Sequence, residues 1–250
     1  MAFGYWFKFY RSRRIRQEER KKILDALVNS GSRISSPSNR ISYWDDIRND
    51  WVQAKSEQDV IKHFSESPKC TAIQLWHNFF FTEEKEDIGD YRLGIYSSQN
   101  GDWITVMIDG VYVRLFESAK NKKYLTYPNP NIERFLLLAK TVCQELTPEF
   151  GVGDCEDFFE WEDSLKTSDI ESVIKEKRYR DIFDVNRVGW ANFYSCDIVH
   201  TIGEKKLMRA PVWKIENLAN GMLILLQPNP YPSWEKIRRV KAFIDFLNKN

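Results

Sequence analysis

The stretch YRLGIYSSQNGDWITVMIDGVYVRLF, residues 91–116, decides the fold class of this chain. It contains three runs rich in β-branched and aromatic residues, at 91–96, 103–108 and 111–116. Between them stand Gln-Asn-Gly-Asp and Asp-Gly, which are typical of tight hairpin turns because Asn, Asp and Gly tolerate positive φ. The sequence therefore predicts an antiparallel meander in this stretch.

Other strand and helix patterns surround this meander. Strands are predicted at residues 3–10, 41–45, 69–81, 155–161, 188–195, 213–218 and 222–227 from their β-rich composition. Helices are predicted at 14–28, 56–64, 131–147, 168–177, 196–203 and 233–247 from helical spacing of apolar residues. Ser56 and Asn131 are the predicted N-caps of two of these helices.

This mixture predicts an α+β fold, with mainly antiparallel sheet flanked by helices that shield its apolar faces. The Pro/Asn cluster at residues 127–131 is the clearest internal boundary. It is too short to act as a flexible linker. We therefore expect one domain over residues 1–250, built from two related α/β layers at 1–126 and 127–250.

Composition argues for a reduced, soluble protein. The 37 Lys and Arg residues nearly balance the 36 Asp and Glu residues, so no overall field favours nucleic acid or an anionic membrane. The four cysteines include no CxxC pair, and a chain of 250 residues needs no disulfide framework. The sequence has neither a secretory signal pattern nor a long apolar run, so we expect a cytoplasmic location without membrane contact.

Catalytic motifs are absent from the sequence, including phosphate-binding loops, the GxSxG elbow and zinc-type clusters. We therefore expect no cofactor, no metal site and no enzymatic activity. The histidines, His63, His77 and His200, are far apart in sequence, and Cys196 with His200 is the least implausible dyad. A hydrolytic enzyme with dispersed catalytic residues remains an open alternative.

An acidic run with aromatic residues occupies positions 154–163, DCEDFFEWED. Its carboxylates could steer a basic partner and its rings could anchor that partner, so this run is the predicted partner-binding surface. The predicted binding residues are Asp154, Glu156, Asp157, Glu160, Trp161, Glu162 and Asp163. The competing interpretation is a solvated strand edge that its charges protect from aggregation.

A basic run lies at positions 8–22, where eight of fifteen residues are Lys or Arg. Contact with nucleic acid is one interpretation, and a nucleic-acid-binding accessory protein is a further alternative. However, Glu18 and Glu19 interrupt the run, as they do on an ordinary exposed helix face. We therefore expect no nucleic-acid partner.

The second half of the chain contains Pro148 and Gly151 after a helix pattern, Gly189, Trp190 and Tyr194 in a strand pattern, and Gly221 before a hydrophobic strand. With this pattern, residues 130–250 resemble the bacterial immunity protein 52 family. In that family a helix ending in Pro-x-x-Gly precedes an acidic strand, a Gly-Trp-x-x-Tyr strand follows, and a Gly-led hydrophobic strand leads into the last helix. The matching residues are Pro148, Gly151, Gly189, Trp190, Tyr194 and Gly221 with 222–226, and one extra residue separates Trp190 from Tyr194. The first half departs from the family in its longer meander and basic opening helix.

The resemblance implies an immunity protein, which binds and neutralises a toxin, often a nuclease, delivered by a neighbouring cell. Such a role requires a stable scaffold and a specific charged surface, and the acidic run suits a basic toxin. Gly189, Trp190, Tyr194 and Gly221 would then be structural motif residues, since strand aromatics usually pack into a core.

Overall fold

The computed structural model describes most of the chain, with gaps between its described ranges. The described residues are 4–38, 40–45, 47–67, 70–80, 86–109, 129–155, 167–184, 187–230 and 233–249. The predicted strand at 111–116 and the greater part of the predicted strand at 155–161 lie outside them.

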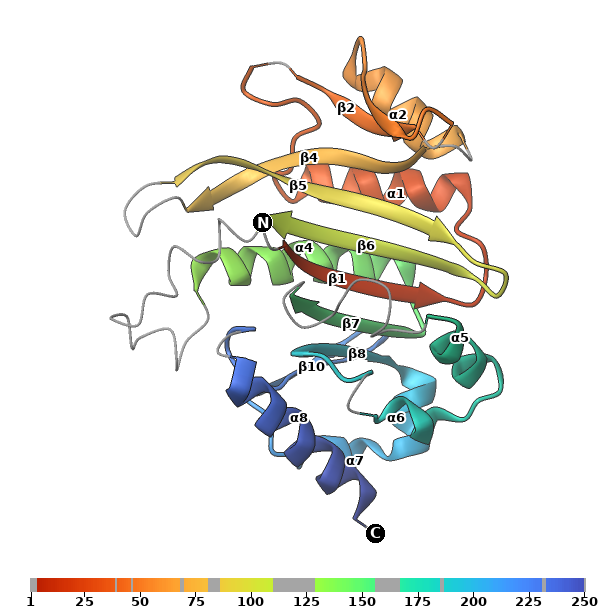
Figure 1. Ribbon diagram of the computed structural model, residues 1–250, viewed down its shortest axis with the longest axis vertical. Coiled ribbons are helices and arrows are strands. Elements are labelled where there is room, and N and C mark those ends of the chain that lie inside the picture. Colours follow the sequence, from red (N-terminus) through yellow and green to blue (C-terminus); the bar gives the residue numbers. More distant parts are fainter. Residues whose placement is uncertain are drawn as a thin grey trace.

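One antiparallel sheet runs through the molecule (Figure 1). Its strands are β1 (Gly4–Arg11), β2 (Ser42–Asp45), β3 (Asp50–Gln53), β4 (Cys70–Phe80), β5 (Glu86–Ser97), β6 (Asp102–Asp109), β7 (Phe150–Cys155), β8 (Ala191–Ser195), β9 (Lys214–Leu218) and β10 (Gly221–Leu225). They lie in the order β3-β2-β4-β5-β6-β1-β7-β8-β10-β9. The mixed α+β class is thereby confirmed.

The two predicted layers share this sheet. Strand β1 pairs with β6 on one side, where Tyr10 lies opposite Trp103, and with β7 on the other, where Tyr10 lies opposite Phe150. All these pairings are antiparallel. The sheet is therefore continuous across the boundary predicted between residues 126 and 127.

Helices cover the sheet in two groups. They are α1 (Gln17–Asn29), α2 (Glu57–Glu66), α4 (Pro130–Leu146), α5 (Thr167–Lys175), the 3-10 helix η3 (Tyr179–Ile182), α6 (Cys196–Ile202), α7 (Glu204–Leu207) and α8 (Ser233–Asn248). In Figure 1, α1 and α4 lie behind the sheet, whereas α5, α6 and α8 lie in front of its C-terminal half. Among the helices that the structure describes, none is long and apolar enough to cross a membrane.

The helix caps confirm one prediction and correct another. The Ser56 side chain accepts a hydrogen bond from the Asp59 backbone N–H, as predicted for the start of α2. Helix α4 begins earlier than predicted, because Asn129 is its N-cap and accepts from the Ile132 backbone N–H. The fixed φ of Pro130 suits the first helical position, so Asn131 lies inside the first turn, where it is buried.

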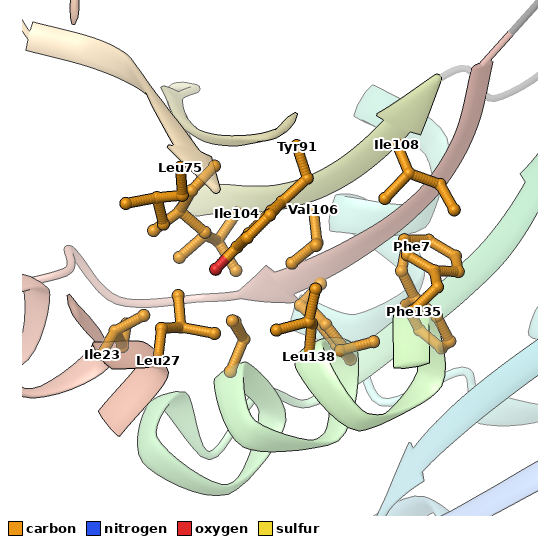
Figure 2. Close-up of a cluster of buried hydrophobic side chains, with 14 of the residues drawn as sticks. Phe7, Ile23, Leu27, Leu75, Tyr91, Ile104, Val106, Ile108, Phe135 and Leu138 are labelled. Carbon is orange, nitrogen blue, oxygen red and sulfur yellow. The ribbon is translucent and has the colours of Figure 1, made fainter. Parts of the chain in front are cut away.

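The first core lies between the sheet and the group α1, α2 and α4 (Figure 2). Alternate residues of β1, Tyr5, Phe7 and Phe9, point to this side, as a strand's period of two requires. Figure 2 shows the sheet and helix side chains meeting in one layer, including Phe7, Ile23, Leu27, Leu75, Tyr91, Ile104, Val106, Ile108, Phe135 and Leu138.

The second core lies on the opposite face of the sheet. It takes the other residues of β1, Trp6 and Tyr10, together with side chains of α5, η3, α6 and α8. Strand β10 contributes to both cores, with Leu223 in the first and Ile224 in the second. Helices thus sandwich the C-terminal part of the sheet.

Candidate functional site

The predicted acidic surface begins at the end of β7, and its first residue is buried. Asp154 is 1% exposed, and Lys236 of α8 approaches it with Nζ at 2.7 Å from Oδ1 and 2.8 Å from Oδ2. The prediction that Asp154 belongs to an exposed surface is therefore corrected. Its side chain shares a face of β7 with Phe150 and Val152, which belong to the second core.

The remaining predicted binding residues follow β7 in the chain. Glu156, Asp157, Glu160, Trp161, Glu162 and Asp163 lie outside the described residues. We call residues 156–163 the acidic segment. Its five carboxylates have no compensating Lys or Arg within the segment.

Helix α5, which follows the acidic segment, is fixed to the sheet by Glu171. This carboxylate is buried and accepts hydrogen bonds from Trp103 Nε1 at 2.9 Å and from Asn100 Nδ2 at 3.2 Å. Tyr10 donates to the Asn100 backbone carbonyl at 2.9 Å. Burial raises the pKa of Tyr10, and the negative charges of Glu171 and Glu149 raise it further.

These contacts place the described residues that flank the acidic segment on the same face of the sheet. Asp154, two residues before the segment, is tied to α8, and Glu171, eight residues after it, is tied to β6. Trp103 and Val152 both belong to the second core, so the two attachment points share that face.

The four predicted motif residues lie in the interior. Trp190 is 1% exposed and donates its indole N–H to the Gln227 carbonyl at 2.8 Å, which ties β8 to the chain after β10. Tyr194 packs against Phe150 and Phe183, with ring centroids 6.1 Å and 5.2 Å away. Burial raises the pKa of the Tyr194 phenol.

At Gly189 and Gly221 the backbone lies so close to a neighbouring segment that a side chain would not fit. A Cβ at Gly189 would lie 2.6 Å from the Gly153 carbonyl oxygen of β7. A Cβ at Gly221 would lie 2.2 Å from the Tyr194 carbonyl oxygen, and the φ of Gly221 is +157°. The geometry gives all four motif residues packing roles.

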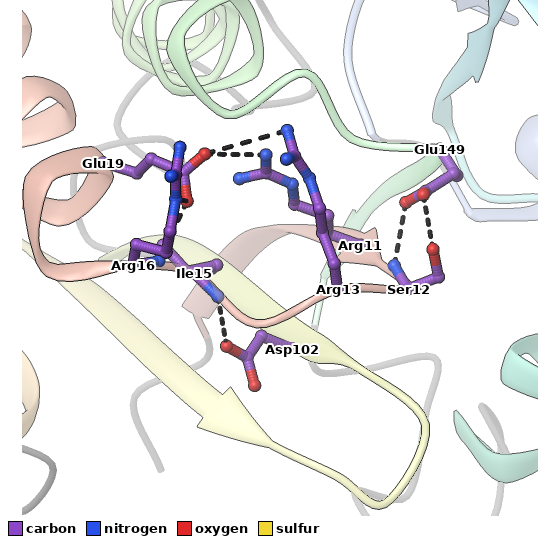
Figure 3. Close-up of polar contacts among 8 residues, drawn as sticks. All are labelled: Arg11, Ser12, Arg13, Ile15, Arg16, Glu19, Asp102 and Glu149. Atoms are coloured by element: carbon purple, nitrogen blue, oxygen red, sulfur yellow. Dashed lines mark hydrogen bonds and ion pairs between the residues drawn. The ribbon is translucent and has the colours of Figure 1, made fainter.

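The basic run is largely engaged in ion pairs at the junction of β1 and α1 (Figure 3). Arg11 is buried and places Nη2 2.8 Å from Glu19 Oε1, and Arg16 approaches the same carboxylate at 3.5 Å. Arg14 binds the buried Asp102 at 2.6 Å. Arg11 is the buried cation of this group, and its pair with Glu19 joins β1 to α1.

Glu19 is the anion around which this cluster is built. Partial burial raises its pKa, but hydrogen bonds from the Arg16 backbone N–H and from Arg11, together with the Arg11 charge, outweigh burial. The pKa of Glu19 falls to about 2. Nearby, Ser12 donates its backbone N–H and its hydroxyl to Glu149, just before β7.

The histidines are placed apart. His63 of α2 stacks on Tyr43 of β2, with ring centroids 4.3 Å apart. His77 Nδ1 lies 3.1 Å from the Asn78 carbonyl oxygen. His200 and Cys196 are exposed on α6.

Within the described ranges, no group of three or more His, Cys, Asp or Glu residues could hold a metal ion. Cys143 is buried, and burial raises the pKa of its thiol. A thiol in that setting is a poor nucleophile.

Comparisons with known proteins place few constraints on function. No family model matches the chain, and no curated protein matches it. Among solved structures, the chain is similar to Pseudomonas aeruginosa T6SS protein PA0821, with a TM-score of 0.47, 10% sequence identity, and coverage of 97% of this chain and 73% of that chain. A likeness at this level carries no functional argument.

Proposed function

We propose that this chain is a non-enzymatic protein-binding module, an immunity protein that binds and neutralises a toxin through its acidic segment. The observation that carries the proposal is the attachment of both flanks of that segment to one sheet face. Asp154 is held by Lys236 and Glu171 by Trp103, so a described residue on each flank of the segment is fixed. Fixed flanks reduce the ordering cost that a chain segment incurs on binding.

The composition of the acidic segment favours a basic protein as partner. Carboxylates without nearby cations raise the rate of encounter with a basic surface. Phe158, Phe159 and Trp161 stand between these carboxylates, and aromatic side chains are frequent energetic anchors in interfaces. A nuclease, whose substrate is a polyanion, has the kind of basic surface that this segment would match.

The alternatives receive less support from the described residues. A nucleic-acid-binding role would use the basic run, yet Arg11, Arg14 and Arg16 are engaged with Glu19 and Asp102. A hydrolase would need a base beside a nucleophile, and His63 instead stacks on Tyr43.

Co-expression with the products of neighbouring genes tests the proposal. Each candidate toxin is co-purified with the wild-type chain and with the double variant D157K/E160K, and the affinity is then measured by calorimetry. Reversing two charges should weaken binding by about 100-fold. The matched control is E133K/E145K, which reverses two exposed acids on α4, on the other side of the sheet.

The control variant should retain wild-type affinity and should still protect cells from the toxin. Failure of every neighbouring product to co-purify would reject the proposed function. An unchanged affinity in D157K/E160K would reject the acidic segment as the binding surface.

A further inference from the structure

One face of the sheet carries large side chains that the helices leave exposed. In β2–β5, residues such as Tyr43, Leu75 and Leu93 point into the first core, and their neighbours in sequence point the other way. Figure 1 shows this side of β4 and β5 in front, away from α1 and α4. We call it the open face, and its partly or fully exposed residues include Trp44, Trp51, Gln74, Trp76, Arg92 and Tyr96.

Aromatic rings and one arginine are grouped on the open face. The Arg92 guanidinium carbon lies 5.5 Å from the centroid of the Trp51 ring. Trp51 in turn meets Trp44 edge to face, with ring centroids 5.9 Å apart. Ala72 and Gly94 lie in the same cross-strand row as Trp44, and the Tyr96 ring lies over Gly94, where an added Cβ would be 3.1 Å from it.

Arg92 is positioned to bind an anion. In the described part of the chain, its contact with Trp51 is accompanied by no ion pair. A guanidinium that lies over an indole has its N–H donors in its own plane, directed outward, where they can bind a carboxylate through two parallel hydrogen bonds. Asp90, on the same face of β5, accepts a hydrogen bond from Gln74 Nε2 at 2.5 Å.

We propose that the open face is a second docking surface, which takes an acidic segment of the protein partner. Arg92 binds a carboxylate of that segment, while Trp44, Trp51 and Tyr96 contact its apolar side chains. Trp, Tyr and Arg are the residues most enriched among binding hot spots. Tyr96 is 48% exposed.

Charge and location favour an acidic protein segment over nucleic acid. A phosphate backbone needs several cations in a row, whereas the single guanidinium of Arg92 can bind one carboxylate although Asp90 and Asp109 also lie on this side of the sheet. The side that carries Arg92 also carries Trp103, which donates to Glu171 of α5, the first helix after the acidic segment. This inference rests on the proposed function, because it takes the partner to be a protein. It adds a cationic and aromatic contact surface to the acidic segment.

Fluorescence anisotropy with labelled probes tests this docking surface on the full chain. The probe is a fluorescein-labelled peptide in which acidic residues, Glu or Asp, alternate with Leu. Two comparison probes are used. One is the same peptide with Lys in place of every acidic residue, and the other is an oligothymidylate. The acidic peptide should bind saturably. R92A should weaken its binding by about tenfold or more, and R92K by several-fold because lysine loses the bidentate geometry.

The matched control is R209A, which removes an exposed arginine two residues after α7, a helix that Figure 1 shows at the opposite end of the molecule from β4 and β5. R209A should bind the acidic peptide like the wild type, and circular dichroism should show all variants folded. Equal binding of the basic peptide, tighter binding of the oligothymidylate, absence of saturable binding, or wild-type affinity in R92A would each overturn the proposal.

The two proposals fail separately. D157K/E160K should still bind the acidic peptide through Arg92, because the residues of the open face are unchanged, and adding R92A to it should weaken that binding. If no toxin co-purifies but peptide binding depends on Arg92, the proposed function fails and the docking surface stands. If the toxin binds with wild-type affinity to R92A, the docking surface fails and the acidic segment stands.

Discussion

Lys236 of α8 and Asp154 of β7 form an ion pair in which both side chains are almost fully buried, at 4% and 0% exposure. The residues are far apart in sequence, and their pairing fixes the last described helix to a strand next to the centre of the sheet. Two charges removed from water attract one another strongly, and each would be very unfavourable alone.

Breaking this pair should destabilise the fold. Lys236→Met keeps the length of the side chain but leaves the Asp154 carboxylate buried without its cation. The free energy of unfolding should fall by about 3 kcal/mol, measured by urea denaturation. The double variant K236M/D154L, which removes both charges, should recover most of this loss, and a double variant as unstable as K236M would contradict the role of charge.

Glu19 should make stability depend on pH in the acid range. Its folded-state pKa of about 2 lies below its ordinary value of 4.5, so the folded state favours the ionised form. The resulting stabilisation is complete above about pH 5 and is lost as the pH falls toward 2. Over that window this carboxylate should contribute on the order of 2 kcal/mol to the decline in the free energy of unfolding.

Glu19→Gln is the comparison for this pH dependence. The variant cannot titrate and leaves Arg11 without its counterion, so it should be less stable than the wild type at pH 7 and show a shallower acid decline. Parallel curves of stability against pH for the two proteins would contradict the assignment.

Glu171→Ala should loosen the attachment of α5 to the sheet. The substitution leaves the buried Trp103 indole N–H without its acceptor, which costs about 2 kcal/mol. Thermal unfolding measures the change. Glu176→Ala serves as the control, because the Glu176 side chain is 57% exposed and its ion pair with Arg178 should contribute less than about 0.5 kcal/mol.

Gly221→Ala should destabilise the protein through a backbone collision. The new Cβ would lie 2.2 Å from the Tyr194 carbonyl oxygen, so β8 and β10 must separate. A loss of about 2 kcal/mol or more is expected in urea denaturation. Gly203→Ala isolates the cost of backbone strain, because Gly203 has a φ of +99° and an added Cβ would meet only Lys206 Cβ, at 3.9 Å, so about 1 kcal/mol is expected there.

Local structure followed from the sequence where the pattern was long. The helix predicted at 233–247 is α8, and the strands predicted at 91–96 and 103–108 lie within β5 and β6. Strand β3 was not predicted, because a four-residue strand beside a turn leaves too little alternation to recognise. The N-cap of α4 was misplaced by two residues, since Asn129 and Asn131 flank the same proline.

Long-range contacts could not be read from the sequence. Asp154 stands first in an acidic run and looks exposed, and only the fold brings Lys236 to it. Arg92 and Trp51 likewise belong to strands separated by β2 and β4 in the sheet. The alternation of side chains along β5 and β3 predicts that Arg92 and Trp51 each point away from a core. It does not predict that the two side chains meet.

The central position of β1 determines when the sheet can be completed during synthesis. As the chain leaves the ribosome, β1 can pair with β6 once residue 109 has emerged, but its other edge stays unpaired until β7 is made. A nascent chain of that length would expose an unprotected strand edge, which is a template for association with other chains. We therefore expect truncated chains that end before Phe150 to aggregate, and chaperones to bind preferentially at that stage of translation.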